Sequence, residues 1–145
     1  MTASYKGKKR GFPKHVRLLE TLQQTEAWRS LKPGPRALYV ELRRRYNGAN
    51  NGRIFMSHRE AADLLNVHRN TVPDYFSELE RRHLIRDMGK GYLGADGHGI
   101  ATRWALCDEP MGGKAPDLSY RSWTEKQNPG IKAVLTRHKN CASGS

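Results

Sequence analysis

The side chains best suited to chemistry in this sequence form a short polar run, His68-Arg69-Asn70-Thr71, followed by Ser77. Arginine forms two hydrogen bonds with guanine, and asparagine forms two with adenine. The run therefore favours contact with base edges in a DNA groove, provided that a rigid element presents these side chains together. Asp74 fits this chemistry least, because a carboxylate repels phosphate. It could accept a bond from cytosine, but a role as a helix cap is favoured.

Residues typical of catalysis or metal binding form no recognisable constellation. His138 and Cys141 have metal-like spacing but supply only two ligands, and no Ser-His-Asp or paired-carboxylate signature is evident. The glycine-rich stretch GKGYLGADGHG (residues 89–99) lacks the GK[ST] ending and the following helix of a phosphate-binding loop. We therefore expect no enzyme activity, no metal, no cofactor and no small-molecule ligand.

The element that must position the polar run is the stretch from Ser57 to Arg82, which predicts two helices joined by a short turn. Ser57 followed by Glu60 is a capping box that starts the first helix. Asn66 tolerates the left-handed conformation that ends a helix, and Val67 can fill the corner. One apolar face of this helix is predicted at Ala61, Leu64 and Leu65.

The second helix is best started at Thr71 as its cap, because Pro73 then falls in the first turn, where proline is tolerated. Asp74 then takes the capping-box position, and residues 68–70 form a tight, partly 3₁₀ entry. The apolar face is predicted at Val72, Tyr75, Phe76 and Leu79. Two interpretations follow: an ordinary helical hairpin in a core, or a helix-turn-helix whose second helix enters the DNA major groove. The polar run and the charge of the chain favour the second.

A family resemblance rests on these residues. EAADLLNVHRNTV (residues 60–72) resembles the helix-turn-helix of bacterial winged-helix regulators, in which Arg-Asn-Thr-Val opens the recognition helix. From about Thr25 to Asp108, the motifs TEAWRSL, RALYVELRRRYNG, NNGRIFMS and ATRWAL resemble a family encoded in alphaproteobacterial genomes, often on plasmids, prophages and integrative elements. The tail motif RHKNCAS is similar too. The resemblance implies a fold, but such domains serve repressors, activators and replication initiators alike.

The composition of the chain restricts the chemical class of its partner. The 145 residues carry 26 Lys and Arg against 14 acids, a net charge of +12, which indicates a polyanion such as nucleic acid or an anionic membrane surface. No apolar run has the length of a membrane span, and no signal peptide is visible. Two cysteines far apart in sequence are typical of free thiols in a cytosolic protein. We expect a cytoplasmic, nucleoid-associated protein that does not contact membranes.

Basic residues flank the predicted helix pair. Residues 1–17 hold six basic residues and no acid, interrupted by glycine and proline, which predicts a flexible arm that either lies along DNA or is a solvated tail. A helix beginning at Pro33 carries the apolar stripe Leu38, Tyr39, Leu42 and Tyr46. Arg43-Arg44-Arg45 ends it, and two interpretations are open: the arginines serve only the helix dipole, or at least one of them also contacts phosphate. Short helical segments at 16–24 and 26–31 are expected before it, the second one capped by Thr25 and burying Trp28.

A β-hairpin is expected after the helix pair. We predict a strand at Leu84–Met88, a loop at Gly89–Gly99 and a strand at Ile100–Cys107, with Trp104 and Leu106 facing the core. A short strand within Arg53–Met56 should pair with them, after the turn-rich loop NGANNG, which is long enough to project. As a wing, the hairpin would bring Lys90 and His98 to the minor groove or the DNA backbone, although a loose connection would share its glycine content.

These features predict an α+β fold: a winged helix-turn-helix with a three-helix core, a short β-hairpin wing and flexible basic termini. The arm covers 1–17, the DNA-binding domain 18–108, and a linker with a basic tail 109–145, in which Tyr120 and Trp123 dock on the domain or form a dimer contact. The candidate DNA-binding residues are Arg59, His68, Arg69, Asn70, Thr71, Ser77, Lys90 and His98. Weaker backbone contacts are expected at Lys8, Lys9, Arg10, Arg44 and Arg45.

The predicted function is sequence-specific binding of double-stranded DNA, as a transcriptional regulator, with a possible homodimer on DNA. Two alternatives remain open. One is a replication or recombination accessory protein of a mobile element. The other is a winged helix that binds nucleic acid without reading bases.

Overall fold

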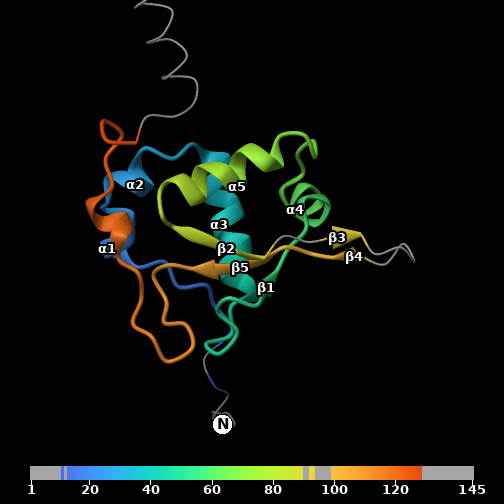
Figure 1. The fold of residues 1–145 in the computed structure, drawn as a ribbon, viewed down its shortest axis with the longest axis horizontal. Coiled ribbons are helices and arrows are strands. Elements are labelled where there is room, and N and C mark those ends of the chain that lie inside the picture. Colours follow the sequence, from blue (N-terminus) through green and yellow to red (C-terminus); the bar gives the residue numbers. More distant parts are fainter. Residues whose placement is uncertain (1–10, 12, 90–91, 94–98, 129–145) are drawn as a thin grey trace, which may run out of the picture.

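The computed structural model describes residues 11, 13–89, 92–93 and 99–128 (Figure 1). These residues form an α+β fold in which helices cover one side of a small antiparallel sheet. The first three helices among the described residues are α1 (Glu20–Gln23), α2 (Glu26–Arg29) and α3 (Pro33–Arg45). The helix expected at 16–24 is thus a single turn. Thr25 caps α2 as predicted, since its hydroxyl accepts the amide of Trp28.

The helix pair follows the predicted boundaries closely. Helix α4 spans His58–Leu65 and α5 spans Val72–Arg81, and both pack against α3. Helix α4 buries Ala61 and Ala62, whose small side chains let it approach its neighbours closely. Leu64 is 43% exposed, so its predicted place on the apolar face is wrong. Position 62, rather than 64, faces the core.

The described strands form two antiparallel sheets. Strands β1 (Ile54–Phe55), β5 (Arg103–Leu106) and β2 (Ile85–Gly89) form an antiparallel sheet in the order β1-β5-β2. The predicted pairing of a strand before α4 with the hairpin is therefore confirmed. Strands β3 (Tyr92–Leu93) and β4 (Gly99–Ile100) form a second pair. The expected loop at 89–99 thus contains paired backbone, and the expected strand at 100–107 is divided between β4 and β5.

An aromatic stack holds the helix pair on the sheet. Phe76 of α5 lies parallel to Trp104 of β5, with ring centroids 4.4 Å apart, and His58 of α4 stacks on the other side at 5.2 Å. Trp104 and Leu106 are buried as predicted. Ala105, predicted on the outer face, is also buried, at 4% exposure. Residues 109–117 fold back over this end of the sheet, so both faces of β5 are covered there.

The NGANNG loop is exposed at Asn47–Ala49 and anchored at its end. Asn51 is buried, and its amide side chain bonds the backbone of Leu106 in both directions, at 2.7 Å and 2.9 Å. Asn47 accepts two backbone amides within the loop, from Ala49 and Asn50. These side-chain bonds replace strand pairing and fix the loop against β5.

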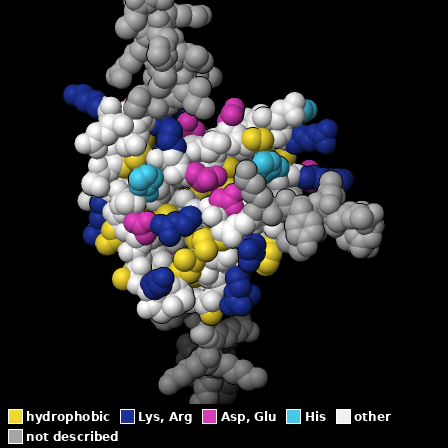
Figure 2. Space-filling model, in the orientation of Figure 1, with side chains coloured by type: hydrophobic (Ala, Val, Ile, Leu, Met, Phe, Trp, Pro, Cys, Tyr) yellow, Lys and Arg dark blue, Asp and Glu magenta, His cyan; other side chains and the backbone are white. Residues whose placement is uncertain are grey.

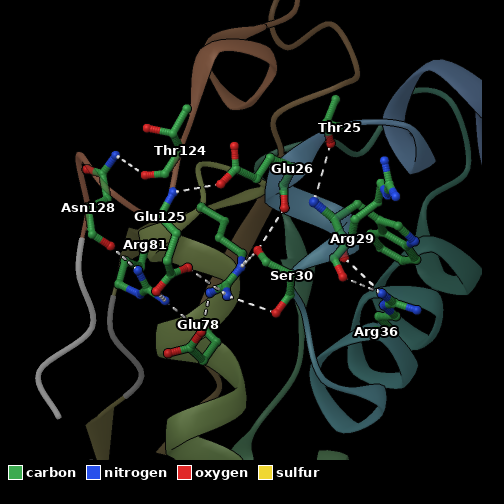
Figure 3. A network of polar contacts seen from close by, with 12 residues as sticks. Thr25, Glu26, Arg29, Ser30, Arg36, Glu78, Arg81, Thr124, Glu125 and Asn128 are labelled. Atoms are coloured by element: carbon green, nitrogen blue, oxygen red, sulfur yellow. Dashed lines mark hydrogen bonds and ion pairs between the residues drawn. The ribbon is translucent and has the colours of Figure 1, made fainter. Parts of the chain in front are cut away.

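Packing continues beyond Asp108. The 3₁₀ turn η1 (Ser119–Ser122) carries Tyr120 into the core at 0% exposure, and Trp123 follows at 3%. Docking of these two aromatics on the domain is thus confirmed. Arg81 and Arg82 lie over the Trp123 ring, at 5.2 Å and 4.8 Å from its centroid. Figure 3 shows the following residues, Thr124 to Asn128, against α2 and the end of α5.

None of the described helices combines the length and the apolar character needed to cross a bilayer.

Candidate nucleic-acid interface

The turn between α4 and α5 is fixed by the residues that the sequence singles out. The capping box is present: Ser57 accepts the amide of Glu60, and the Glu60 carboxylate accepts that of Ser57. At the other end Asn66 has φ 54° and ψ 48°, the left-handed conformation. The amide of Val67 reaches back to the carbonyl of Ala62 at 3.1 Å, as in a Schellman motif. The angle between the two helices is therefore set locally.

The polar run forms the entry to α5. Two successive bonds of the 3₁₀ type, from the amides of Thr71 and Val72 to the carbonyls of His68 and Arg69, confirm the predicted tight turn. Thr71 holds the predicted N-cap position, but its side chain does not cap the helix as predicted. Among the described residues the side chain of Thr71 makes no capping bond, because its backbone is already helical. The imidazole Nδ1 of His68 instead accepts the amide of Asn70 at 3.2 Å.

Exposure separates the predicted contact residues. Arg59, His68, Arg69, Asn70 and Ser77 are exposed, and Thr71 is half-buried. The bonds at the turn gather residues 68–71 at one end of α5, and the dipole of α5 adds positive potential there. Lys90, His98, Lys8, Lys9 and Arg10 lie outside the described residues.

The three arginines that end α3 have different environments. Arg43 is buried and pairs with Asp108 at 2.8 Å and Glu109 at 2.7 Å, so it is a core residue. Arg45 donates to the carbonyl of Phe55 and pairs with Glu60 at 3.3 Å. It therefore ties α3 to β1 and to the capping box of α4. Arg44 is exposed and pairs with Glu41 on its own helix, which leaves it the most accessible of the three to a phosphate.

Positive charge is uneven along the helix pair. The exposed surface of α5 carries Asp74 and Glu80, and Glu78 is half-buried beside Arg81 and Arg82. Burial would raise the pKa of Glu78, but hydrogen bonds and charge from these two arginines outweigh it and lower the pKa. A polyanion therefore meets favourable charge at the start of α5 and unfavourable charge further along it.

Sequence reasoning missed two accessible arginines on the sheet. Arg53 and Arg103 are exposed: Arg53 directly precedes β1, and Arg103 of β5 lies opposite Phe55 of β1. Figure 2 shows dark blue side chains beside hydrophobic ones over this part of the molecule. The alternation Arg53-Ile54-Phe55, with only the middle residue buried, is the sequence signal that points to this face.

Comparisons with known proteins add no relative: no family model, no curated protein and no solved structure matches the chain. Among the described residues, no group of three or more side chains could hold a metal ion.

Proposed function

We propose that this protein is a winged helix-turn-helix protein that binds specific sites on double-stranded DNA and acts as a bacterial transcriptional regulator in the cytoplasm, at the nucleoid. Helix α4 and the turn at Asn66 set the start of α5 into the major groove, where Arg69 and Asn70 contact base edges. Arg59, His68, Thr71 and Ser77 contribute around them. Lys90 and His98 on the wing, and the basic arm, contact phosphates beside the groove.

The observation that carries the proposal is the locally fixed turn that ends in the polar run His68-Arg69-Asn70-Thr71, most of which is exposed. A helical hairpin serving only the core needs no exposed Arg-Asn pair at its turn, whereas a DNA reader needs polar side chains held rigidly at that point. The three-stranded antiparallel sheet next to the pair is compatible with a winged helix. The acids on α5 favour a groove contact limited to its first turn.

One alternative function shares the same surface. A replication or recombination accessory protein of a mobile element would use the same DNA-binding module, alone or as a homodimer on DNA. Genomic footprinting with the purified protein separates the two, because it identifies the bound site together with its neighbouring genes. A site at a promoter supports the regulator, and a site at an origin or attachment sequence supports the alternative.

Binding measurements on that site test the readout. Arg69→Ala and Asn70→Ala should each cost about 1–3 kcal/mol on the specific duplex and much less on random duplex. Arg121→Ala removes the same charge from an exposed position on η1 and is the matched control. Equal losses on both DNAs would show that Arg69 and Asn70 contact only phosphate.

Salt dependence tests the nucleic-acid interaction itself. About five to eight phosphate contacts per protomer predict a slope of log affinity against log salt of roughly −4 to −7. A slope shallower than about −2 would contradict the proposal, because neutralised phosphates release counterions in proportion to their number.

A further inference from the structure

An aromatic ring lies exposed on the outer face of the sheet. Phe55 of β1 is 46% exposed, the largest exposure among the large hydrophobic side chains that the structure describes as exposed. It lies directly opposite Arg103 of β5 in antiparallel register, so the two residues belong to the same face of the sheet. Arg53, two residues before Phe55, is also exposed, and the strand period places it on the same face.

The arginines around this ring leave positive charge in place. Among the described residues neither Arg53 nor Arg103 pairs with a carboxylate, and Arg103 donates only to the carbonyl of Met88, at 3.1 Å. Arg45 donates to the carbonyl of Phe55 and neutralises Glu60 beside it. Arg45 thus fixes the backbone of Phe55, whose ring is exposed. The Arg103 guanidinium reaches toward β2, where it donates to the carbonyl of Met88, so Arg53 and Arg103 lie on the face of the ring without covering it.

From this arrangement we propose that the surface formed by Arg53, Phe55 and Arg103 binds single-stranded DNA by stacking a base on the Phe55 ring. Bases in a duplex stack on one another and offer no free face, whereas the bases of a single strand do. An exposed ring on a face that also carries two arginines suits a base and its neighbouring phosphates, both in shape and in charge. This surface is separate from the start of α5, and the protein would hold an unpaired strand in addition to a duplex.

The shape of the patch argues against charge alone. Arginines scattered on a surface bind any polyanion, including acidic peptides, and need no exposed ring between them. An exposed phenylalanine fixed through its backbone gains nothing from solvent, but gains the stacking contact from a base. Substitutions at Phe55 therefore separate base stacking from simple charge attraction.

The test uses a dye-labelled oligothymidylate of about 16 nucleotides and the full chain, with affinity measured by fluorescence anisotropy. Phe55→Leu keeps an apolar side chain but removes the ring, and should weaken binding about 5- to 150-fold, the range measured for stacking on one base. Phe55→Trp should retain the affinity or raise it. Leu118→Ala, at another exposed apolar position (39%), is the matched control and should change binding less than twofold.

The Phe55→Trp variant also provides a direct readout. The native Trp28, Trp104 and Trp123 are 7%, 2% and 3% exposed, so the new indole is the accessible fluorophore. Its emission should fall when oligothymidylate binds and remain unchanged when polyglutamate is added. Unchanged emission at saturating oligothymidylate would overturn the proposal, as would equal losses for Phe55→Leu and Leu118→Ala.

The duplex proposal and the single-strand proposal can be tested independently. Phe55→Leu should leave affinity for the specific duplex within about twofold, and Arg69→Ala should leave oligothymidylate affinity within about twofold. Thermal melting of each variant verifies that the fold is intact. If the native protein fails to bind duplex but binds oligothymidylate, the proposal for α5 is wrong. If it binds duplex but fails to bind oligothymidylate, the proposal for the sheet face is wrong.

Discussion

The buried pair of Arg43 and Asp108 should control the stability of the fold. The Arg43 side chain is 4% exposed and that of Asp108 is 1% exposed, and the guanidinium Nη1 lies 2.8 Å from the carboxylate Oδ2. The hydroxyl of Tyr39 donates to the other carboxylate oxygen at 2.7 Å. Substituting either Arg43→Met or Asp108→Ala leaves the other charge without its buried partner. Each change should therefore cost about 3–5 kcal/mol of unfolding free energy.

The double variant distinguishes coupling from independent packing losses. When both charges are removed, neither remains buried alone, so Arg43→Met with Asp108→Ala should cost about 3 kcal/mol less than the two single changes added together. Tyr39→Phe serves as a reference, because it removes only one hydrogen bond to the Asp108 carboxylate; it should cost about 1.5–3 kcal/mol of unfolding free energy. Glu109 continues to pair with Arg43 in Asp108→Ala, which places that variant at the lower end of its range.

Urea unfolding followed by tryptophan fluorescence measures these values, with the slope against urea concentration as a check on two-state behaviour. Burial raises the pKa of Asp108, despite the opposing charge of Arg43. A carboxyl whose pKa is higher in the folded state opposes folding increasingly as pH rises through that pKa. The deficit of Arg43→Met should therefore be smallest at acidic pH and grow toward neutrality. Additive costs in the double variant would refute this reasoning.

Three further predictions concern other sites. A Cβ on Gly34 would lie 2.3 Å from the Tyr75 ring, so Gly34→Ala should cost about 1–3 kcal/mol in urea unfolding, and Tyr75→Ala should suppress that added cost. The amide of Ser57 and the charge of Arg45 lower the pKa of Glu60, so the stability that Glu60 contributes above its unfolded pKa should be lost as pH falls through its folded pKa. Glu60→Gln should therefore lose less unfolding free energy over this acidic range than the native protein, and an equal loss in both would contradict the prediction. Burial raises the pKa of Cys107 to about 12, so iodoacetamide should label it only on unfolding, in a variant without the other cysteine.

The sequence alone determined the helix pair and its turn. The capping box, the left-handed Asn66 and the proline in the first turn of α5 act within a few residues, so their geometry follows from local chemistry. The core-facing side of β5 was predicted for the same reason, because a period of two residues assigns Trp104 and Leu106 to the core. Thr71 holds the predicted N-cap position, but the sequence did not reveal that its backbone is helical there and that its side chain makes no capping bond.

Tertiary structure decided which polar residues remain available. Arg43, Arg44 and Arg45 are identical in the sequence, yet one is buried in a salt bridge, one is exposed and one connects two elements. The choice depends on Asp108 and Glu60, which only the fold brings within reach.

The same holds for the ends of the domain. Trp123 meets Arg82 from 41 positions away along the sequence, and Asn51 bonds a strand 55 positions away. Sequence periodicity reports which face of an element is apolar, but not which distant segment covers it. The burial of Ala105 and the exposure of Leu64 and Phe55 depend on which distant segments pack over them, so only the tertiary structure determines them.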